Sequence, residues 1–382
     1  MATISNQKLW LITTSTMILL ILQSSNGATV GSRRVPAMFV FGDSLVDVGN
    51  DNFLNSSAKA NYYPYGCDFQ GGRPTGRFTN GETLVDMLGR LLGIPYLPAF
   101  ADPSTIRARV LNGVNYASAA AGILDETGQH YGERYSLSKQ VLNFENTILR
   151  LRLLMNGTSL DKYLAKSIAI LVFGSNDYIN NYLMPSLYHS TQKYNPPDFA
   201  NFLLNRYTYQ ILALRSLGLR KFVLAGVGPL GCTPYQRASC QAPAGRCVDN
   251  VNKMLGTFND GLKSLVNRLN SNHPDATFVY CNTYGVFGDI LKKPATYVEH
   301  LKDCTYVISA GFSVVDRGCC RIQNQGQITC LPFLAPCLNR SQYVFFDAYH
   351  PTAVATAIVA WRVFSGSPSD AYPINVQQMS LI

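Results

Sequence analysis

The sequence predicts an α/β protein in which helices cover both faces of one parallel sheet of about five strands. Two observations lead to this prediction. Short apolar runs alternate along the chain with longer stretches of helical periodicity, which is the order of elements that a parallel sheet requires. The runs are apolar at successive positions, as in strands buried between two helix layers. No linker, repeat or shift in composition divides the chain after residue 27, so we expect residues 28–382 to form a single domain.

Five apolar runs are the predicted strands. They occupy residues 37–41, 167–173, 221–225, 276–281 and 343–346. The predicted helices between and after them occupy residues 80–92, 137–154, 199–217, 248–269 and 352–363. Gly93 and Gly218 follow two of these helices, where glycine is favoured. Pro351 precedes the last helix, and proline is favoured where a helix begins.

The first residues indicate export from the cell. Lys8 precedes an apolar segment at 9–22, and small or polar residues follow at 24–28, which are the three parts of a secretory signal peptide. A membrane anchor is the alternative, but the segment is short and is interrupted by Thr-Thr-Ser-Thr at 13–16. We therefore expect a signal peptide over residues 1–27 and a secreted, extracellular protein. No later stretch is apolar over enough residues to span a bilayer, so we expect no stable membrane anchor.

The cysteines fit an oxidising compartment. The chain has 10 cysteines, most of them in loop-like stretches of its C-terminal half, and this predicts disulfides whose pairing the spacing leaves open. We expect a disulfide-tied insertion at about residues 304–337. No Cys-x-x-Cys occurs with a second one or with a His pair, so no metal site is predicted. Asn55, Asn156 and Asn339 begin sequons, which predicts glycosylation of surface loops.

Composition excludes some classes of protein. The chain is 47% hydrophobic and 14% charged, which indicates a folded protein with a sizeable core. Its formal net charge is +9, but the lysines and arginines are scattered and form no dense run. We therefore do not expect nucleic acid as a partner.

A serine follows the first predicted strand. The stretch from Val40 to Asn50 reads VFGDSLVDVGN, and the apolar run stops at Gly42-Asp43-Ser44. Ligands bind at the carboxyl ends of strands in open parallel sheets, which makes Ser44 a candidate site residue. A plain turn also uses Gly, Asp and Ser. Ser44 is a candidate nucleophile only if the chain supplies a base and oxyanion donors.

One histidine is placed to serve as that base. His130, His189 and His300 lie in polar loops, and His273 lies in a turn. His350 follows the last predicted strand, and Asp347 precedes it by three residues, so the carboxylate can hold the imidazole in one tautomer. Asp-x-x-His is common, and a structural histidine is the alternative.

Two further stretches supply hydrogen-bond donors. Asn176, in Gly-Ser-Asn-Asp at 174–177, follows the second predicted strand, although a helix N-cap would use the same residues. The small-residue run at 117–122 allows backbone N–H groups to face a ligand, although close packing would also select small residues. Together with Ser44 and the Asp347–His350 pair, these stretches form the set that serine-dependent acyl transfer needs.

The blocks FVFGDSLVDVGN, GVNYASAAAGI, LVFGSNDY and FFDAYHPT resemble the four signature blocks of the plant GDSL esterase/lipase family, within the SGNH hydrolases. The resemblance extends over about residues 36–364. It implies a flavodoxin-like α/β/α sandwich, a triad of Ser44, Asp347 and His350, and an extracellular location in the apoplast or cell wall. It also implies an oxyanion hole made by the backbone N–H groups of Ser44 and Gly122 and the side chain of Asn176. The chain contains no Gly-x-Ser-x-Gly, which separates it from the α/β-hydrolases.

The predicted function is hydrolysis of carboxylic esters through an acyl-enzyme on Ser44, with no metal or organic cofactor. One alternative is an acyltransferase that passes the acyl group to a hydroxyl, as in cutin synthesis or phenolic acyl transfer. Another is a binding protein without activity, against which the complete residue set argues. The expected substrate is a lipid, wax, cutin-like ester or acetylated saccharide, and the sequence leaves this choice and the oligomeric state open. Five aromatic residues have two possible roles, in a substrate patch near the site or in the core: Tyr62, Tyr63, Tyr65, Phe69 and Phe78.

Overall fold

The structure is a computed structural model that describes residues 35–243, 245–296, 311–322 and 329–382. The predicted signal peptide, Cys304, His300 and part of the predicted insertion at 304–337 lie outside the described residues.

A five-stranded sheet lies at the centre of this part of the chain. In spatial order its strands are β1 (Met38–Gly42), β2 (Ile168–Val172), β3 (Lys221–Ala225), β4 (Thr277–Cys281) and β7 (Ala371–Tyr372). The first four strands are parallel, and β7 pairs with β4 in the antiparallel direction. The predicted α/β class with a mostly parallel sheet is confirmed. The carboxyl ends of β1 to β4 lie at one edge, where a ligand site is expected.

The fifth strand differs from the prediction. The run at 343–346 does form a strand, β6 (Tyr343–Phe345), but β6 pairs with β5 (Val314–Gly318) in a separate two-stranded sheet. The fifth strand of the main sheet is β7, which has only two residues and therefore no apolar run to reveal it. On the other side of β1, the N–H of Tyr116 donates to the carbonyl of Val40 at 2.8 Å, so the segment before the run at 117–122 lies beside β1.

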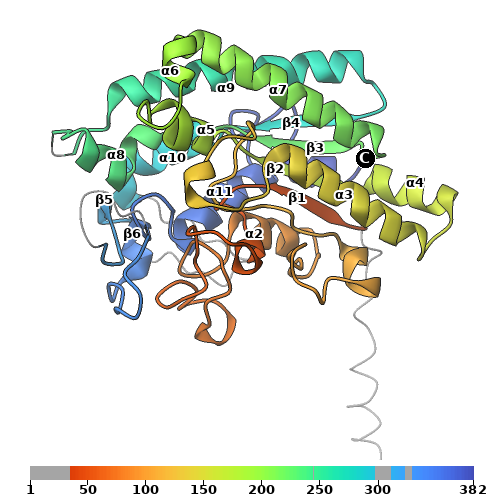
Figure 1. The fold of residues 1–382 in the computed structure, drawn as a ribbon, viewed down its shortest axis with the longest axis horizontal. Coiled ribbons are helices and arrows are strands. Elements are labelled where there is room, and N and C mark those ends of the chain that lie inside the picture. Colours follow the sequence, from red (N-terminus) through yellow and green to blue (C-terminus); the bar gives the residue numbers. More distant parts are fainter. Residues whose placement is uncertain (1–34, 244, 297–310, 323–328) are drawn as a thin grey trace, which may run out of the picture. The chain divides into compact units, whose positions relative to one another are not determined.

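Helices cover both faces of the sheet because successive strand residues face opposite cores. Phe39, Phe222 and Phe278 belong to a core with side chains of α3 (Leu137–Arg152), α7 (Pro196–Ser216) and α9 (Asp249–Asn272). Their strand neighbours belong to a second core with side chains of α2 (Leu84–Leu91), α10 (Thr283–Lys292) and α11 (Ala353–Ser365). Figure 1 shows α7 and α9 on one side of the strands and α2 on the other. The uninterrupted apolar runs follow from this double burial.

The five predicted helices are confirmed as α2, α3, α7, α9 and α11, with ends that differ by a few residues. The structure adds α4 (Gly157–Lys166), α5 (Ser175–Asp177), α6 (Ser190–Lys193), α8 (Pro234–Ser239), α10 and α12 (Val376–Met379). Most of these are short. In α10, Gly285 and Gly288 weaken both the helix propensity and the apolar pattern, so its sequence did not indicate a helix.

Three disulfides are present, Cys232–Cys247, Cys319–Cys337 and Cys320–Cys330. They confirm the prediction of disulfides for these six cysteines. Within the described residues, Cys67, Cys240 and Cys281 form no disulfide. Cys281 is buried at the end of β4, where it serves as a small core residue.

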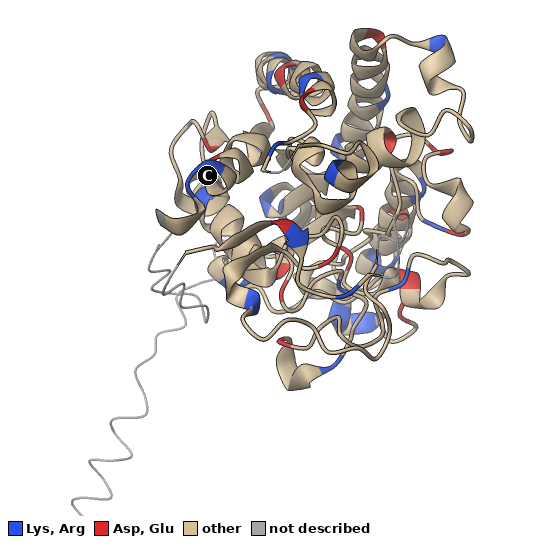
Figure 2. Cartoon of the chain, turned by 90° about the vertical axis from the view of Figure 1, so that its left-hand side faces the viewer, with Lys and Arg blue, Asp and Glu red and all other residues tan. Residues whose placement is uncertain are grey.

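Basic and acidic residues are interspersed along the part of the chain that the structure describes (Figure 2). None of the helices in this part is both long and apolar enough to cross a membrane.

Candidate active site

Ser44 lies two residues beyond the end of β1 in a turn that several hydrogen bonds fix. Gln140 of α3 accepts from the N–H of Gly42 at 2.9 Å and donates to its carbonyl at 2.8 Å. The N–H of Leu45 donates to the carboxylate of Asp43 at 3.0 Å. A Cβ at Gly42 would lie 2.4 Å from Val46 and 2.9 Å from the carbonyl of Val172. The close packing of these segments therefore requires glycine immediately before Asp43 and Ser44.

The structure brings Ser44, His350 and Asp347 together. The Oγ of Ser44 lies 2.8 Å from Nε2 of His350, and Nδ1 of His350 lies 2.8 Å and 3.0 Å from the two carboxylate oxygens of Asp347. Because Nδ1 faces a carboxylate, we assign the proton to Nδ1, which leaves Nε2 as an acceptor for the Ser44 hydroxyl. Asp347 is fully buried, and its Oδ1 also accepts from the N–H groups of Tyr349 and His350 at 2.9 Å and 2.7 Å.

Tyr65 holds the other oxygen of this carboxylate. Its hydroxyl donates to Oδ2 of Asp347 at 2.6 Å and accepts from the N–H of Cys330 at 3.2 Å. Burial raises the pKa of Tyr65 well above its usual value, so the hydroxyl stays protonated and remains a donor. Phe78 packs on the His350 ring with centroids 5.0 Å apart. Of the predicted aromatic patch, Tyr65 is therefore a buried partner of Asp347, and Phe78 is a wall of the site.

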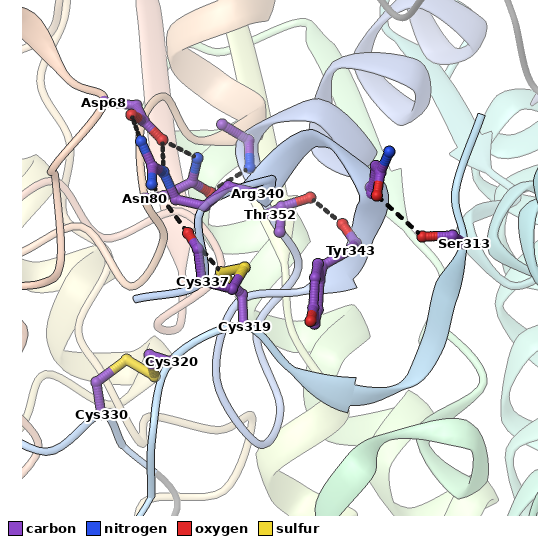
Figure 3. The surroundings of a disulfide bond; sticks show 12 residues. Asp68, Asn80, Ser313, Cys319, Cys320, Cys330, Cys337, Arg340, Tyr343 and Thr352 are labelled. Carbon is purple, nitrogen blue, oxygen red and sulfur yellow. Dashed lines mark hydrogen bonds and ion pairs between the residues drawn. A yellow bond between two sulfur atoms is a disulfide. The ribbon is translucent and has the colours of Figure 1, made fainter. Parts of the chain in front are cut away.

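Two disulfides, Cys319–Cys337 and Cys320–Cys330 (Figure 3), support the loop that carries Asp347 and His350. The N–H groups of Cys319 and Cys320 donate to the carbonyls of Phe345 and Phe346 at 3.1 Å and 2.8 Å, so this cysteine pair extends the pairing of β5 and β6. The N–H of Phe346 in turn donates to the carbonyl of His350 at 2.8 Å, which closes the loop. The Cys320–Cys330 disulfide also fixes the residue whose N–H bonds to Tyr65.

Asn176 lies at the carboxyl end of β2 and faces the same cavity as Ser44. Its Nδ2 donates to the carbonyl of Ala121 at 2.9 Å, and its Oδ1 accepts from Asn180 at 2.6 Å. These two bonds fix the orientation of the amide. An amide nitrogen carries two hydrogens, so Nδ2 keeps one for a ligand in the cavity.

The small-residue run at 117–122 lies beside this amide, but its members have different surroundings. Gly122 is buried and does not line the cavity, and a Cβ there would lie 2.5 Å from Oδ1 of Asp177. Ala119 and Ala120 do line the cavity. The N–H of Ala119 donates to Asp51 at 3.1 Å, whereas that of Ala120, a residue with φ of 61°, has no acceptor in the described part of the chain. The oxyanion role of Gly122 stays a prediction, and Ala120 is a second candidate donor from the same run.

The cavity above Ser44 has a volume of about 310 Å³. Its walls come from segments far apart in the sequence, which are the loop after β1, the run at 117–122, α5 and the loop after β6. Its lining includes Ser57, Ala58, Phe78, Tyr131, Asn180, Leu230, Thr329 and Tyr349. Among the described residues, no group of three or more His, Cys, Asp or Glu side chains is arranged to hold a metal ion.

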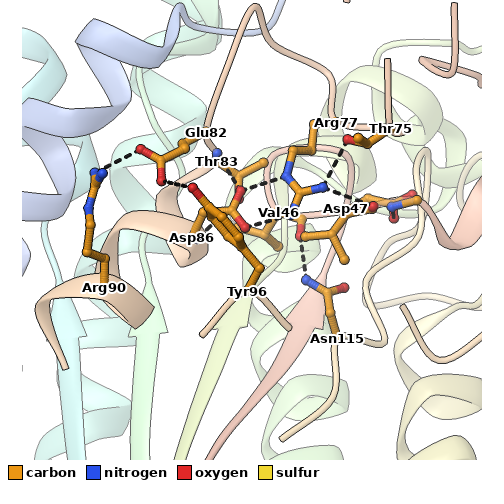
Figure 4. Close-up of polar contacts among 12 residues, drawn as sticks. Val46, Asp47, Thr75, Arg77, Glu82, Thr83, Asp86, Arg90, Tyr96 and Asn115 are labelled. Carbon is orange, nitrogen blue, oxygen red and sulfur yellow. Dashed lines mark hydrogen bonds and ion pairs between the residues drawn. The ribbon is translucent and has the colours of Figure 1, made fainter. Parts of the chain in front are cut away.

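The segment from Arg77 to Asn80 bonds both to the loop after Ser44 and to the loop that carries His350. Figure 4 shows the contacts of Arg77. Arg77 donates to both carboxylate oxygens of Asp86 in α2, at 2.8 Å and 2.7 Å, and to the carbonyl of Val48 in the loop after Ser44. Thr79 donates to the carbonyl of Pro351 at 3.0 Å, next to His350.

Several buried carboxylates lie under the loop after β1. Burial raises the pKa of Asp43 to about 7 and that of Asp177 to about 6. Asp177 accepts from the N–H groups of Ile123 and Leu124, and so holds the end of the run at 117–122. Asp47 accepts from the N–H groups of Gly49 and Asn50 at 2.7 Å and 2.8 Å. Asp43 and Asp47, which the sequence places near Ser44, and Asp177 are loop-forming residues.

Two further histidines and the predicted sequons are not among the residues that line the cavity. His130 contacts the hydroxyl of Tyr188 at 2.7 Å, and His189 contacts Gln192 at 3.1 Å. Asn55, Asn156 and Asn339, the predicted glycosylation sites, are all exposed.

Comparison with known proteins gives consistent matches. The model of the family described as GDSL-like lipase/acylhydrolase matches residues 38–363. GDSL esterase/lipase At1g71250 of Arabidopsis thaliana is 59% identical over 353 residues, covering 92% of this chain and 91% of that protein. GDSL esterase/lipase At5g08460 of the same plant is 50% identical over 368 residues, covering 95% of this chain and 92% of that protein. GDSL esterase/lipase At1g29670 is 48% identical over 353 residues, with 91% and 92% covered.

Proposed function

The chain belongs to the GDSL-like lipase/acylhydrolase family and is a carboxylic ester hydrolase, and from that premise we propose that it acts through an acyl-enzyme on Ser44. His350 is the general base and Asp347 its orienting partner. The observation that carries the proposal is the unbroken line of contacts from Ser44 Oγ to His350 Nε2, at 2.8 Å, and from His350 Nδ1 to Asp347, at 2.8 Å. Both distances are within hydrogen-bond range, and the first allows the proton transfer from Ser44 to His350.

The reaction has two halves. His350 Nε2 takes the proton of Ser44 Oγ while Oγ bonds to the ester carbonyl carbon. The tetrahedral species then collapses, the C–O bond to the alcohol breaks, and His350 returns the proton to the leaving oxygen. Water, deprotonated by His350, attacks the acyl-serine, and the acid departs as Ser44 regains its hydrogen. Asp347 stabilises the imidazolium in both halves.

The negative charge on the carbonyl oxygen needs donors that are already in place. We assign this role to the N–H of Ser44, to Nδ2 of Asn176 and to one backbone N–H of the run at 117–122. The fixed amide of Asn176 supports its assignment, because Asn180 prevents the rotation that would turn the oxygen toward the cavity. Gly122 is the backbone donor that the family resemblance predicts, and Ala120 is the one that lines the cavity.

We also propose that the protein works outside the cell, in the apoplast or cell wall. The three disulfides support an oxidising compartment. The exposed sequons at Asn55, Asn156 and Asn339 are open to glycosylation there. Mass spectrometry of protein from apoplastic fluid tests this, and an intact N-terminus at Met1 or unmodified sequons would count against it.

The direct test of the mechanism is labelling with a fluorophosphonate, which reacts with activated serines. We expect one adduct, on Ser44, that is absent from Ser44→Ala. Ser57→Ala is the matched control because Ser57 lines the same cavity, but its hydroxyl donates to the carbonyl of Tyr131 instead of to a histidine. Label on another serine, or ester hydrolysis retained by Ser44→Ala, would overturn the proposal.

A further inference from the structure

A second cavity adjoins the one above Ser44 and has no part in the mechanism described so far. Four residues line both cavities, Leu45, Ser175, Leu230 and Tyr349. Leu45 directly follows Ser44, and Ser175 directly precedes Asn176. The second cavity therefore begins at the residues that flank the nucleophile and the proposed oxyanion donor.

The lining of the second cavity is mainly apolar. Its remaining walls come from α2, α11, the ends of β2 and β6, and α10, and they include Leu84, Val172, Phe173, Phe287, Phe345 and Val359. Of the three threonines in the lining, Thr233 and Thr283 donate to the backbone carbonyls of Leu230 and Gly226, which leaves the hydroxyl of Thr356 for a ligand. Within the described residues, none of the buried side-chain polar atoms that lack a hydrogen-bond partner belongs to this lining. A polar ligand would find few free partners here, whereas a hydrocarbon needs none.

The size of the cavity suits a short aliphatic chain. Its volume is about 90 Å³. One water molecule requires on the order of 10–15 Å³ of such a volume. The cavity therefore has room for several methylene groups. The Ser44 cavity, at about 310 Å³, is larger and includes the polar residues Ser57, Asn180 and Thr329.

We propose that the second cavity binds the acyl chain of the substrate, so that the enzyme acts on esters of linear aliphatic acids with several carbon atoms. This inference rests on the proposed acyl-enzyme at Ser44, because it is the bond to Ser44 that places the start of the chain beside Leu45. The alcohol part of the ester then occupies the larger cavity. Each methylene group moved from water to an apolar site contributes about fourfold to kcat/KM.

Gly228 offers a way to fill this cavity from its wall. It lines the second cavity and not the first, and a Cβ there would meet only Phe287, at 3.8 Å. A leucine at this position is therefore accommodated by the backbone and projects beside Phe287. Gly226 is unsuitable, because a Cβ would lie 2.8 Å from the hydroxyl of Tyr280. Gly256 of α9 is the matched control, since a Cβ there has nothing within 4 Å and the residue lines neither cavity.

The experiment compares kcat/KM for p-nitrophenyl octanoate and p-nitrophenyl acetate in each variant. We expect the wild type to prefer octanoate. Gly228→Leu should lower the octanoate-to-acetate ratio at least tenfold, because the chain loses several contacts, and Gly256→Leu should leave the ratio unchanged. Phe287→Ala should enlarge the cavity and raise the dodecanoate-to-octanoate ratio at least threefold.

The outcomes separate this inference from the function on which it rests. If Ser44→Ala abolishes hydrolysis but the wild type prefers acetate, or if neither Gly228→Leu nor Phe287→Ala changes its ratio, the cavity is a packing void and the acyl-chain assignment is wrong. If Ser44→Ala still hydrolyses both esters, the proposed function fails instead. Should Gly228→Leu not fold, as judged by its melting temperature, the result with Phe287→Ala decides.

Discussion

Ser44 and His350 meet at 2.8 Å, but the two regions that supply them are built in different ways. The nucleophile side, Ser44 and Asn176, follows β1 and β2, which are buried strands of the main sheet. The base side, Asp347 and His350, follows β6, which lies outside that sheet and pairs with β5. Two disulfides and the hydroxyl of Tyr65 support the base side, whereas apolar packing between two helix layers supports the nucleophile side.

This difference indicates how each region keeps its geometry. Shifting a residue at the end of β1 requires movement of the whole core, because interiors are closely packed. The base side has a two-stranded sheet and a smaller apolar cluster around Phe346, so two disulfides and hydrogen bonds add to the packing there. We therefore expect catalysis to depend on cross-links on the base side and on packing on the nucleophile side.

The largest effect is expected from Asp347→Asn. The amide can still accept from the N–H groups of Tyr349 and His350, so the loop should keep its shape. An amide NH₂ opposite Nδ1 favours the wrong imidazole tautomer, and we expect kcat to fall by roughly 10⁴. Steady-state kinetics with a p-nitrophenyl ester and thermal melting measure both properties. A variant with kcat within tenfold of the wild type would remove Asp347 from the triad.

On the nucleophile side, Asn176→Ala should lower kcat by roughly 10²–10³ with little change in KM, because the lost hydrogen bond forms only as charge develops on the oxygen. The variant also loses the bond to Ala121, so a stability cost of about 1 kcal/mol is expected. If Asn176 served only as a structural residue, melting temperature would fall while kcat stayed near the wild-type value.

Two double variants compare a disulfide of the base side with a disulfide elsewhere in the protein. Cys320→Ala/Cys330→Ala opens a link with 10 residues of separation on the base side, and Cys232→Ala/Cys247→Ala opens one with 15 elsewhere. Both should cost about 3 kcal/mol in the free energy of unfolding, because the closed loops are of similar length. Only the first should also lower kcat, by about tenfold, since it frees the residue that bonds to Tyr65. Equal kcat values in the two double variants would contradict the comparison.

A smaller effect is expected from Tyr65→Phe, which removes one hydrogen bond to Asp347 and keeps the ring. We expect kcat to fall about fivefold to tenfold with KM unchanged, because a hydrogen bond to a charged group contributes about 1.5–3 kcal/mol and only part of this is expressed in the reaction. Tyr62→Phe is the control, as the Tyr62 hydroxyl donates to the carbonyl of Cys330 and does not contact Asp347. If both variants behaved alike, Tyr65 would not act as a positioning residue.

The difference between the two sides also decides which structural features could be predicted from the sequence. The strands of the main sheet were predictable because double burial demands uninterrupted apolar runs, and Ser44 and Asn176 follow directly from their ends. Asp347 and His350 were singled out by their place after the predicted strand at 343–346 together with their spacing, because Asp-x-x-His alone also fits a structural histidine. The contact of Tyr65 with Asp347 was not, because the two residues are 282 positions apart and a tyrosine in an aromatic stretch carries no sign of a polar partner.

Other features depend on tertiary structure in the same way. The partner of β6 could not be inferred, because β5 is partly exposed and contains Asp316 and Arg317 in place of an apolar run. The disulfide pairing is set by which loops meet, and sequence spacing does not determine this. The choice between Gly122 and Ala120 as a donor depends on which backbone N–H faces the cavity. The sequence of a run of small residues does not determine this.

The last prediction concerns stability instead of kcat and uses the carboxylates of the two sides. On the base side, burial acts to raise the pKa of Asp68. Arg340 bonds to its carboxylate at 2.6 Å and 2.7 Å, and this pairing outweighs burial and lowers the pKa. On the nucleophile side, burial raises the pKa of Asp43 from 3.8 to about 7. The folded state therefore binds a proton at Asp43 more tightly than the unfolded state does. This contribution to stability is complete below about pH 4 and is lost as the pH rises through about 7.

Asp43→Asn removes that titration while keeping an oxygen for the N–H of Leu45. Its free energy of unfolding should exceed the wild-type value by more at pH 7.5 than at pH 4, with a difference on the order of 3 kcal/mol, since one pKa unit corresponds to about 1.36 kcal/mol. Denaturant unfolding at the two pH values measures it. Asp68→Asn should behave in the opposite sense and in a lower pH range, losing more stability at pH 7.5 than near pH 2, because the lowered pKa of Asp68 keeps its carboxylate ionised and paired with Arg340 until the pH falls below about 4. Parallel pH profiles for the wild type and Asp43→Asn would mean that Asp43 is solvated well enough to ionise in the folded protein, and the contrast between the two sides would then rest on disulfides and packing alone.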